Sequence, residues 1–114
     1  PLYLTGESPM AQTFDGAQYP DALRFTLSSS VNEATQVVIP STAVKVSIKF
    51  ASNAGKVAFE GTDGSAINAH YADVAANAWA EMSLGDGINV SNGIGSIYVA
   101  SATASTVCTV VIEG

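Results

Sequence analysis

The side chains that most often carry out catalysis are scarce in this sequence. His70 is its single histidine, and a serine-type triad would need a nucleophile and a carboxylate to meet it in the fold. No Gly-x-Ser-x-Gly segment is present to expose such a serine. Glu60, Glu81 and other carboxylates could form a glycosidase pair, but no spacing singles out two of them. We therefore predict that the protein is not an enzyme and that His70 lies at a surface or an interface.

Ligands for a metal ion are equally few. Zinc sites draw mainly on cysteine and histidine, and Cys108 and His70 are the only residues of these types. Calcium requires several oxygen ligands at close spacing. Asp63 and Asp86 each stand in an Asp-Gly segment, which is first of all a turn signature. The sequence therefore predicts no metal and no cofactor.

Aromatic side chains could bind carbohydrate if they lay exposed on one face. Trp79, Tyr71 and Tyr98 are the candidates, although we expect the single tryptophan of so small a domain to lie in the core. Cys108 stands in an uncharged, strand-like run, which predicts a small buried hydrophobic residue. A reactive thiol would want a neighbouring positive charge, and none is near it in the sequence.

The charge composition narrows the possible partners. The chain of 114 residues has a net charge of −6, and charged residues make up 12% of it, about half the usual share of roughly 25%. Only four residues are basic, so nucleic acid and anionic membranes are unexpected partners. No apolar stretch approaches the roughly 18 residues that cross a bilayer. The shortage of charge predicts that part of the surface is covered by another copy or another protein.

From residue 22 onward the apolar residues recur with a period of two, which predicts strands. Turn signals recur about every ten residues, which is typical of a sandwich or barrel. We predict an all-β domain over residues 22–114, a β-sandwich or jelly-roll-like fold of about eight strands. The turn at Asn53 predicts a hairpin between its two flanking strands. The expected core contains Phe25, Val46, Ile48, Phe59, Val99 and Val110.

Residues 66–82 fit two interpretations. Apolar residues spaced by three and four, from Ile67 to Met82, would suit a helix, which would make the fold α+β. Asn68 and Asp73 are indifferent helix formers, and a period of two places Ala80 and Met82 on one face. We favour two short strands joined near residues 75–77. A further short strand is expected over residues 88–90.

Residues 1–21 differ from the rest of the chain. Proline and glycine interrupt any regular pattern there, yet the segment is too rich in large apolar residues for a disordered linker. It is expected either to pack on its own domain or to act as an arm that binds a neighbouring subunit. The arm's expected partner-binding residues are Leu2, Tyr3, Leu4, Met10 and Phe14.

The strand over 106–113 supports self-association. It carries Val107, Val110, Val111 and Ile112 with no charge before Glu113, whereas exposed edge strands usually carry lysine, proline or a bulge. We infer that this strand is either central in a sheet or covered by a partner. Because the arm is a second means of binding a neighbouring subunit, we expect a closed homo-oligomer.

Together, the small β-rich domain, its low charge and its distinct arm resemble accessory virion proteins of tailed bacteriophages, above all capsid decoration or cement proteins. The segments 79–85, 97–101 and 107–110 resemble the closing strands of many small phage structural proteins. The resemblance implies folding in the host cytoplasm, a place on the capsid surface of the virion, binding to the major capsid protein, and an oligomer that is a trimer rather than a dimer.

Two other functions remain open at this stage. One is a receptor- or glycan-binding domain of a phage tail fibre or spike, which coplanar exposed aromatics in a groove would favour. The other is a small hydrolase or lectin-like module of a larger chain. The start of the sequence lacks the basic and apolar regions of a signal peptide, which also favours synthesis in a cytoplasm.

Overall fold

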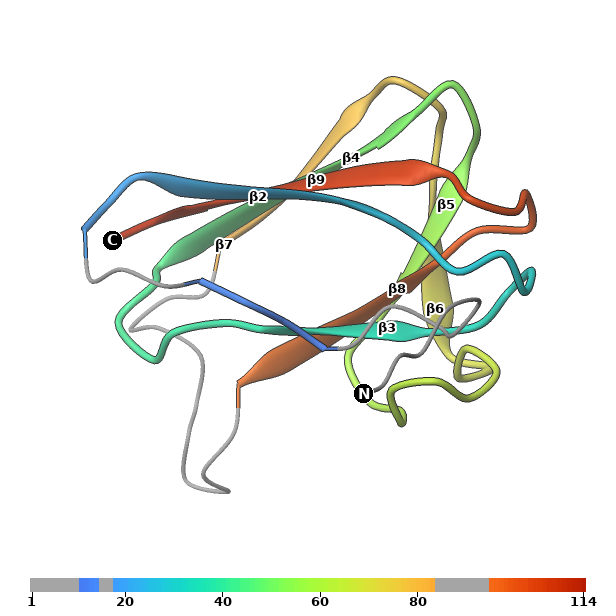
Figure 1. Ribbon diagram of the computed structural model, residues 1–114. Coiled ribbons are helices and arrows are strands. Elements are labelled where there is room, and N and C mark those ends of the chain that lie inside the picture. The colour runs from blue at the N-terminus through green and yellow to red at the C-terminus, as the bar shows by residue number, and fades with distance from the viewer. Residues whose placement is uncertain (1–10, 15–17, 84–94) are drawn as a thin grey trace, which may run out of the picture.

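Strands make up all the regular secondary structure in residues 11–14, 18–83 and 95–114, the parts of the chain that the computed structural model describes. They form two sheets that face each other as a β-sandwich (Figure 1). The five-stranded sheet contains, in spatial order, β1 (Gln12–Thr13), β3 (Thr35–Val38), β8 (Ser96–Ala100), β5 (Gly55–Ala58) and β6 (Tyr71–Val74). The four-stranded sheet contains β2 (Asp21–Thr26), β9 (Val107–Glu113), β4 (Lys45–Ala51) and β7 (Trp79–Ser83).

This architecture confirms the predicted all-β fold. The alternative helix around residues 66–82 does not form, because β6 and β7 occupy that segment and turn at residues 76–77, as the period-two pattern predicts. No described segment is a helix of the length and apolar character needed to cross a membrane. The strand expected over residues 88–90 lies outside the described residues.

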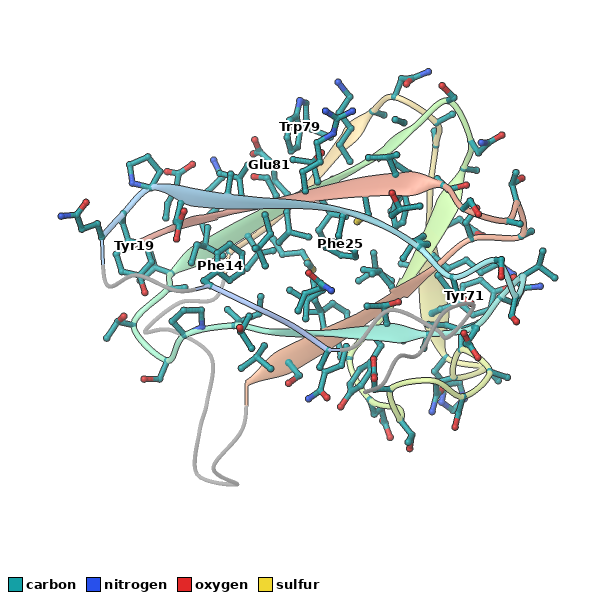
Figure 2. All side chains as sticks on the ribbon, viewed as in Figure 1. Phe14, Tyr19, Phe25, Tyr71, Trp79 and Glu81 are labelled. Carbon is teal, nitrogen blue, oxygen red and sulfur yellow. The ribbon has the colours of Figure 1, made fainter. Side chains whose placement is uncertain are left out.

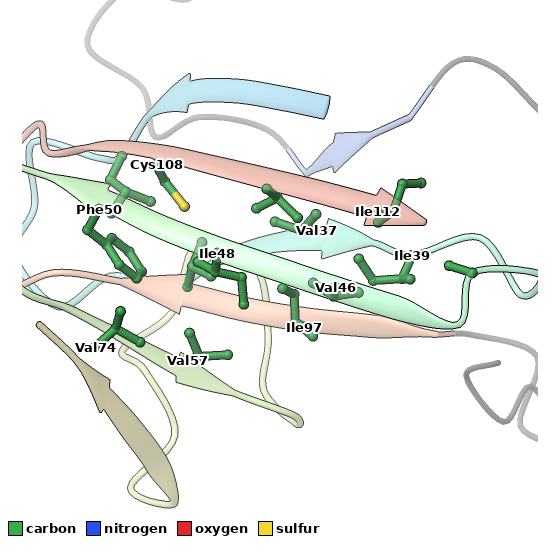
Figure 3. Close-up of a cluster of buried hydrophobic side chains, with 14 residues drawn as sticks. Val37, Ile39, Val46, Ile48, Phe50, Val57, Val74, Ile97, Cys108 and Ile112 are labelled. Carbon is green, nitrogen blue, oxygen red and sulfur yellow. The ribbon is translucent and has the colours of Figure 1, made fainter. Parts of the chain in front are cut away.

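The core lies between the two sheets, where alternating apolar side chains from both layers meet (Figure 3). On β4, Val46, Ile48 and Phe50 are fully buried, while Lys45 and Lys49 on the opposite face remain partly exposed. The expected core residues Val99 and Val110 are also fully buried. Phe25, which is half-buried, packs against the edge of this cluster.

Phe59 is the exception among the expected core residues, because its side chain is 59% exposed. Its position two residues after Val57 predicts burial only if the strand continues. Instead, the ladders that join β5 to β6 and β8 both end at Ala58, and the chain bends at Phe59 and Glu60. Once the period of two is broken, nothing directs the Phe59 ring toward the core.

The hairpin predicted around Asn53 is also wrong. β4 pairs with β7 and β9 in the four-stranded sheet, whereas β5 pairs with β6 and β8 in the five-stranded sheet. The turn at residues 52–54 therefore carries the chain from one layer to the other. At this crossing the backbone of Gly55 lies against the Phe50 ring, and a Cβ added to Gly55 would lie 2.3 Å from it.

The uncharged strand β9 is central in its sheet. It pairs with all of β2 on one side and all of β4 on the other. This position explains why the strand needs no lysine, proline or bulge against unwanted pairing. It also means that β9 needs no partner chain to cover its edges.

The contact between Gly55 and Phe50 yields a stability prediction. We expect Gly55→Ala to lower the free energy of unfolding by about 1–3 kcal/mol, because a buried ring must move to admit the new methyl group. Urea unfolding followed by circular dichroism measures the change. In a Phe50→Leu background the same substitution should cost much less, since the ring is gone. Equal costs in both backgrounds would show that the Phe50 ring is not what constrains residue 55.

Candidate functional site

The residues whose side chains could take part in catalysis or metal binding lie apart from one another. His70 is exposed, and its backbone N–H donates a hydrogen bond to Asn68 Oδ1 at 2.7 Å. Asp63 Oδ1 accepts a hydrogen bond from the backbone N–H of Gln36 at 2.8 Å, so it serves as a backbone partner. Within the described ranges, no group of three or more histidine, cysteine, aspartate or glutamate side chains is placed to hold a metal ion.

Cys108 is buried in the core, as its uncharged surroundings in the sequence predict. Burial raises the pKa of its thiol from 9.0 to about 12, because a thiolate would lose its hydration there. The nucleophilic form of the side chain is therefore suppressed at neutral pH.

This burial predicts slow thiol chemistry. At pH 8 we expect Ellman's reagent to leave Cys108 unmodified in the native protein and to react fully after unfolding in guanidinium chloride. Since the folded pKa is about 12 and the unfolded value 9.0, ionisation of the unfolded thiol should lower stability as pH rises through this window. A Cys108→Ala variant should lose less stability over the same window. Rapid labelling of the native protein would contradict the burial.

The expected partner-binding residues of the arm fall into two groups. Leu2, Tyr3, Leu4 and Met10 lie outside the described residues. Phe14 is half-buried and packs against the core of its own chain. Just before it, β1 pairs in parallel with Val37 and Val38 of β3, so residues 12–14 lie on their own domain.

Most of the free edge of β3 is covered by its own chain. β1 pairs with Val37 and Val38, the second half of the strand. The loop after β5 contacts Gln36 in the first half, and Ala34 just before the strand. In that loop Asp63 binds the Gln36 N–H, Ser65 O accepts from Ala34 N–H, and Gly64 N–H donates to Ala34 O. At the other end of the same sheet, β6 has no strand on its outer side among the described residues.

Three large apolar side chains lie exposed near this open edge, and we call Val31, Phe59 and Tyr71 the β6 patch. Their exposed fractions are 54%, 59% and 40%. Tyr71 lies opposite Ala58 across the β5–β6 ladder, and Phe59 follows Ala58 directly. Lys56 links Val31 to the other two residues. Its Nζ donates to Asn32 Oδ1, in the residue after Val31, at 2.8 Å and lies 4.8 Å from the Tyr71 ring centre.

A second candidate surface lies on the outer face of the four-stranded sheet. Trp79 is 49% exposed there, which overturns the expectation that it lies in the core (Figure 2). Ser47, Trp79, Glu81 and Val111 line a shallow open depression of about 200 Å³ beside the indole. The sequence did contain a signal, since a period of two places Trp79 on the same face as Glu81 and opposite Ala80 and Met82.

The three aromatic candidates for glycan binding are not brought together. Tyr71 and Tyr98 lie on the five-stranded sheet, each opposite Ala58 in the ladders. Trp79 lies on β7 of the other sheet, as does Glu81, whereas Glu60 follows β5. Gly61 approaches the Tyr98 ring, which is half-buried. Trp79 is therefore the aromatic residue with an adjoining depression.

Comparison with known proteins gives little further information. No protein-family model and no curated protein matches the chain. A similar solved structure is described as "Bacillus endospore appendages form a novel family of disulfide-linked pili". It shares 13% identity with a TM-score of 0.45, over 82% of this chain and 83% of that one. A likeness of this size supports no conclusion on family or function.

Proposed function

We propose that this protein is a structural subunit that self-associates into a closed homo-oligomer and coats a larger assembly. The observation that carries the proposal is the open edge of β6 with the β6 patch beside it. Exposed strand edges offer unpaired backbone groups to another chain, and monomeric proteins usually block them. Among the described residues the chain itself largely blocks the edge at β3, whereas no described strand lies on the outer side of β6.

The β6 patch supplies the apolar contacts that such pairing needs. Burying a large apolar side chain contributes about 1.5–3 kcal/mol before ordering costs. Of the three side chains, Tyr71 is already held in place by its strand and by the Lys56 contact, so little ordering is required of it.

We further propose that the N-terminal arm binds a neighbouring copy or the coated surface. Leu2, Tyr3, Leu4 and Met10 would form this contact. Phe14 and β1 would anchor the base of the arm on its own domain, where they already pack. The resemblance to phage decoration proteins gives the most specific version of the proposal: the coated surface is the major capsid protein of a virion, and the oligomer is a trimer.

Substitutions in the β6 patch test self-association. We expect Phe59→Ser and Tyr71→Ser to shift the protein toward monomer by at least about tenfold in dissociation constant, because each removes exposed apolar area from the contact. Sedimentation equilibrium at micromolar concentration measures both the constant and the mass of the oligomer. Trp79→Ser, an equally exposed aromatic residue on the other sheet, is the matched control and should leave the constant unchanged. A monomeric parent protein would contradict the proposal.

Deletion of residues 1–10 tests the arm. This truncation leaves β1, Phe14 and every described contact in place, so the circular dichroism spectrum and thermal midpoint should stay close to those of the full chain. We expect weaker oligomers, or weaker attachment to purified capsids that lack the protein. A truncated protein that still decorates such capsids at full occupancy would count against the arm.

A receptor- or glycan-binding domain of a phage tail fibre or spike is the second candidate function. The half-exposed Trp79 beside a shallow depression favours it, because an indole face packs well against the C–H face of a sugar ring.

A further inference from the structure

The basic residues of this acidic chain are unevenly distributed. The chain has ten acidic and four basic residues, and Arg24, Lys45 and Lys49 lie on the outer face of the four-stranded sheet. The single tryptophan, Trp79, is on the same face. Three of the four basic residues and the single tryptophan thus lie on one face of the sandwich, whereas Lys56 lies on the other sheet beside Tyr71.

The strand register places three of these residues in one row. Trp79 of β7 lies opposite Lys49 of β4, Lys49 lies opposite Thr109 of β9, and Thr109 lies opposite Arg24 of β2. Neighbouring strands are about 4.8 Å apart, so the row runs about 14 Å from the indole to the guanidinium strand. The adjacent row consists of Glu81, Ser47, Val111 and Ala22. The last three of these side chains are small, so the surface lies low beside Trp79.

The two cations of this row have no carboxylate partner within the described part of the chain. Lys45 instead engages both carboxylates of the face, with its Nζ 3.4 Å from Glu81 and 3.9 Å from Glu113. The contact recorded for Lys49 is with the Trp79 ring, whose centre lies 5.6 Å from Lys49 Nζ. Arg24 is exposed. Among the described residues, the row therefore offers two positive charges without a carboxylate partner beside the aromatic ring of Trp79.

We propose that this outer face binds an acidic glycan along the row from Trp79 to Arg24. One sugar ring packs against the indole of Trp79. Carboxylate, sulfate or phosphate groups on the glycan accept charge-assisted hydrogen bonds from Lys49 and Arg24. Thr109, which is half-buried between Lys49 and Arg24, offers a hydroxyl group to the sugar. This site gives the second candidate function a ligand class, and it does not depend on self-association through the β6 patch.

Lys49 has a specific part in binding. In the free protein its ammonium group lies over the indole, an interaction of modest strength at an exposed site. An anionic group on the ligand is a stronger partner for the ammonium than the ring is, because the interaction is then between full charges. Lys49 therefore turns from the ring toward the ligand and frees the indole face for the sugar. The exchange should alter Trp79 fluorescence, which reports on this site alone because the chain has one tryptophan.

The same face suits a second protein chain poorly. Protein interfaces are dominated by large buried anchors, and here Trp79 is the sole aromatic residue above a strip of small side chains. In a twofold contact the face would meet its own copy, which would bring uncompensated cations toward one another. A flexible acidic peptide could satisfy the cations but has no rigid ring face to cover the indole.

Titration with matched oligosaccharides tests the proposal. An oligogalacturonate is compared with an uncharged galacto-oligosaccharide of equal length, using Trp79 fluorescence and calorimetry. We expect the acidic probe to bind at least about tenfold more tightly, because only it pairs with the cations, and its affinity should fall as salt is raised. Trp79→Ala, Lys49→Gln and Arg24→Gln should each weaken binding at least about tenfold, whereas Lys56→Gln on the other sheet should not.

The possible outcomes separate this inference from the proposed functions. Equal binding of both probes would overturn the acidic specificity while leaving a glycan-binding role in place. Equal binding of oligoglutamate would show a merely electrostatic surface and would overturn the glycan assignment. Absence of binding to oligogalacturonate and to a sulfated oligosaccharide at millimolar concentration would overturn the site, whatever the oligomeric state. All three substitutions lie on the outer face of the sheet and should leave the thermal midpoint unchanged, so lost binding cannot be ascribed to unfolding.

Discussion

The pairing of β9 between β2 and β4 is the interaction on which the rest of the structure depends. This last strand of the chain supplies backbone partners to its two neighbours along their whole lengths. Its inward side chains Cys108, Val110 and Ile112 are buried in the core. Without it, β2 would have no partner and β4 would keep only β7. The sheet that presents Trp79 therefore exists only once residues far apart in the sequence have met.

The connections between strands follow from this arrangement. The chain passes to the other sheet after every strand from β1 to β8 except β5, and within the described strands only β5 and β6 are consecutive neighbours in one sheet. Each crossing lets an apolar strand place one face against the opposite layer. Where the crossing is tight, as between Phe50 and Gly55, the backbone itself becomes part of the packed core. Such a topology consists mostly of non-local contacts, which makes its closure a cooperative event.

The two outer faces of the sandwich are chemically different. Within the described residues, the five-stranded sheet ends in β6, which has no strand on its outer side and lies beside exposed apolar side chains, as suits contact with another protein chain. The four-stranded sheet has a flat strip of small residues with Trp79 and cations around it, which suits a polar, flat ligand. The surface proposed for assembly and the surface proposed for a ligand thus lie on different sheets, so that occupation of one need not obstruct the other.

The sequence by itself determined the class of fold and most of the core. The alternation around Val46, Ile48 and Phe50 specifies which face of a strand is buried, because side chains on a strand point to opposite sides. The same rule identified β6 and β7 against a helix and placed Trp79 and Glu81 together. Only the tertiary structure decided which strands pair. Apolar alternation indicates that one face of a strand is buried, but not which strands lie beside it or which sheet covers that face. It separated β4 from β5, placed β9 at the centre of a sheet, and ended β5 before Phe59. The candidate binding row depends on the same decision, because Trp79, Lys49 and Arg24 are neighbours only through the register of four strands.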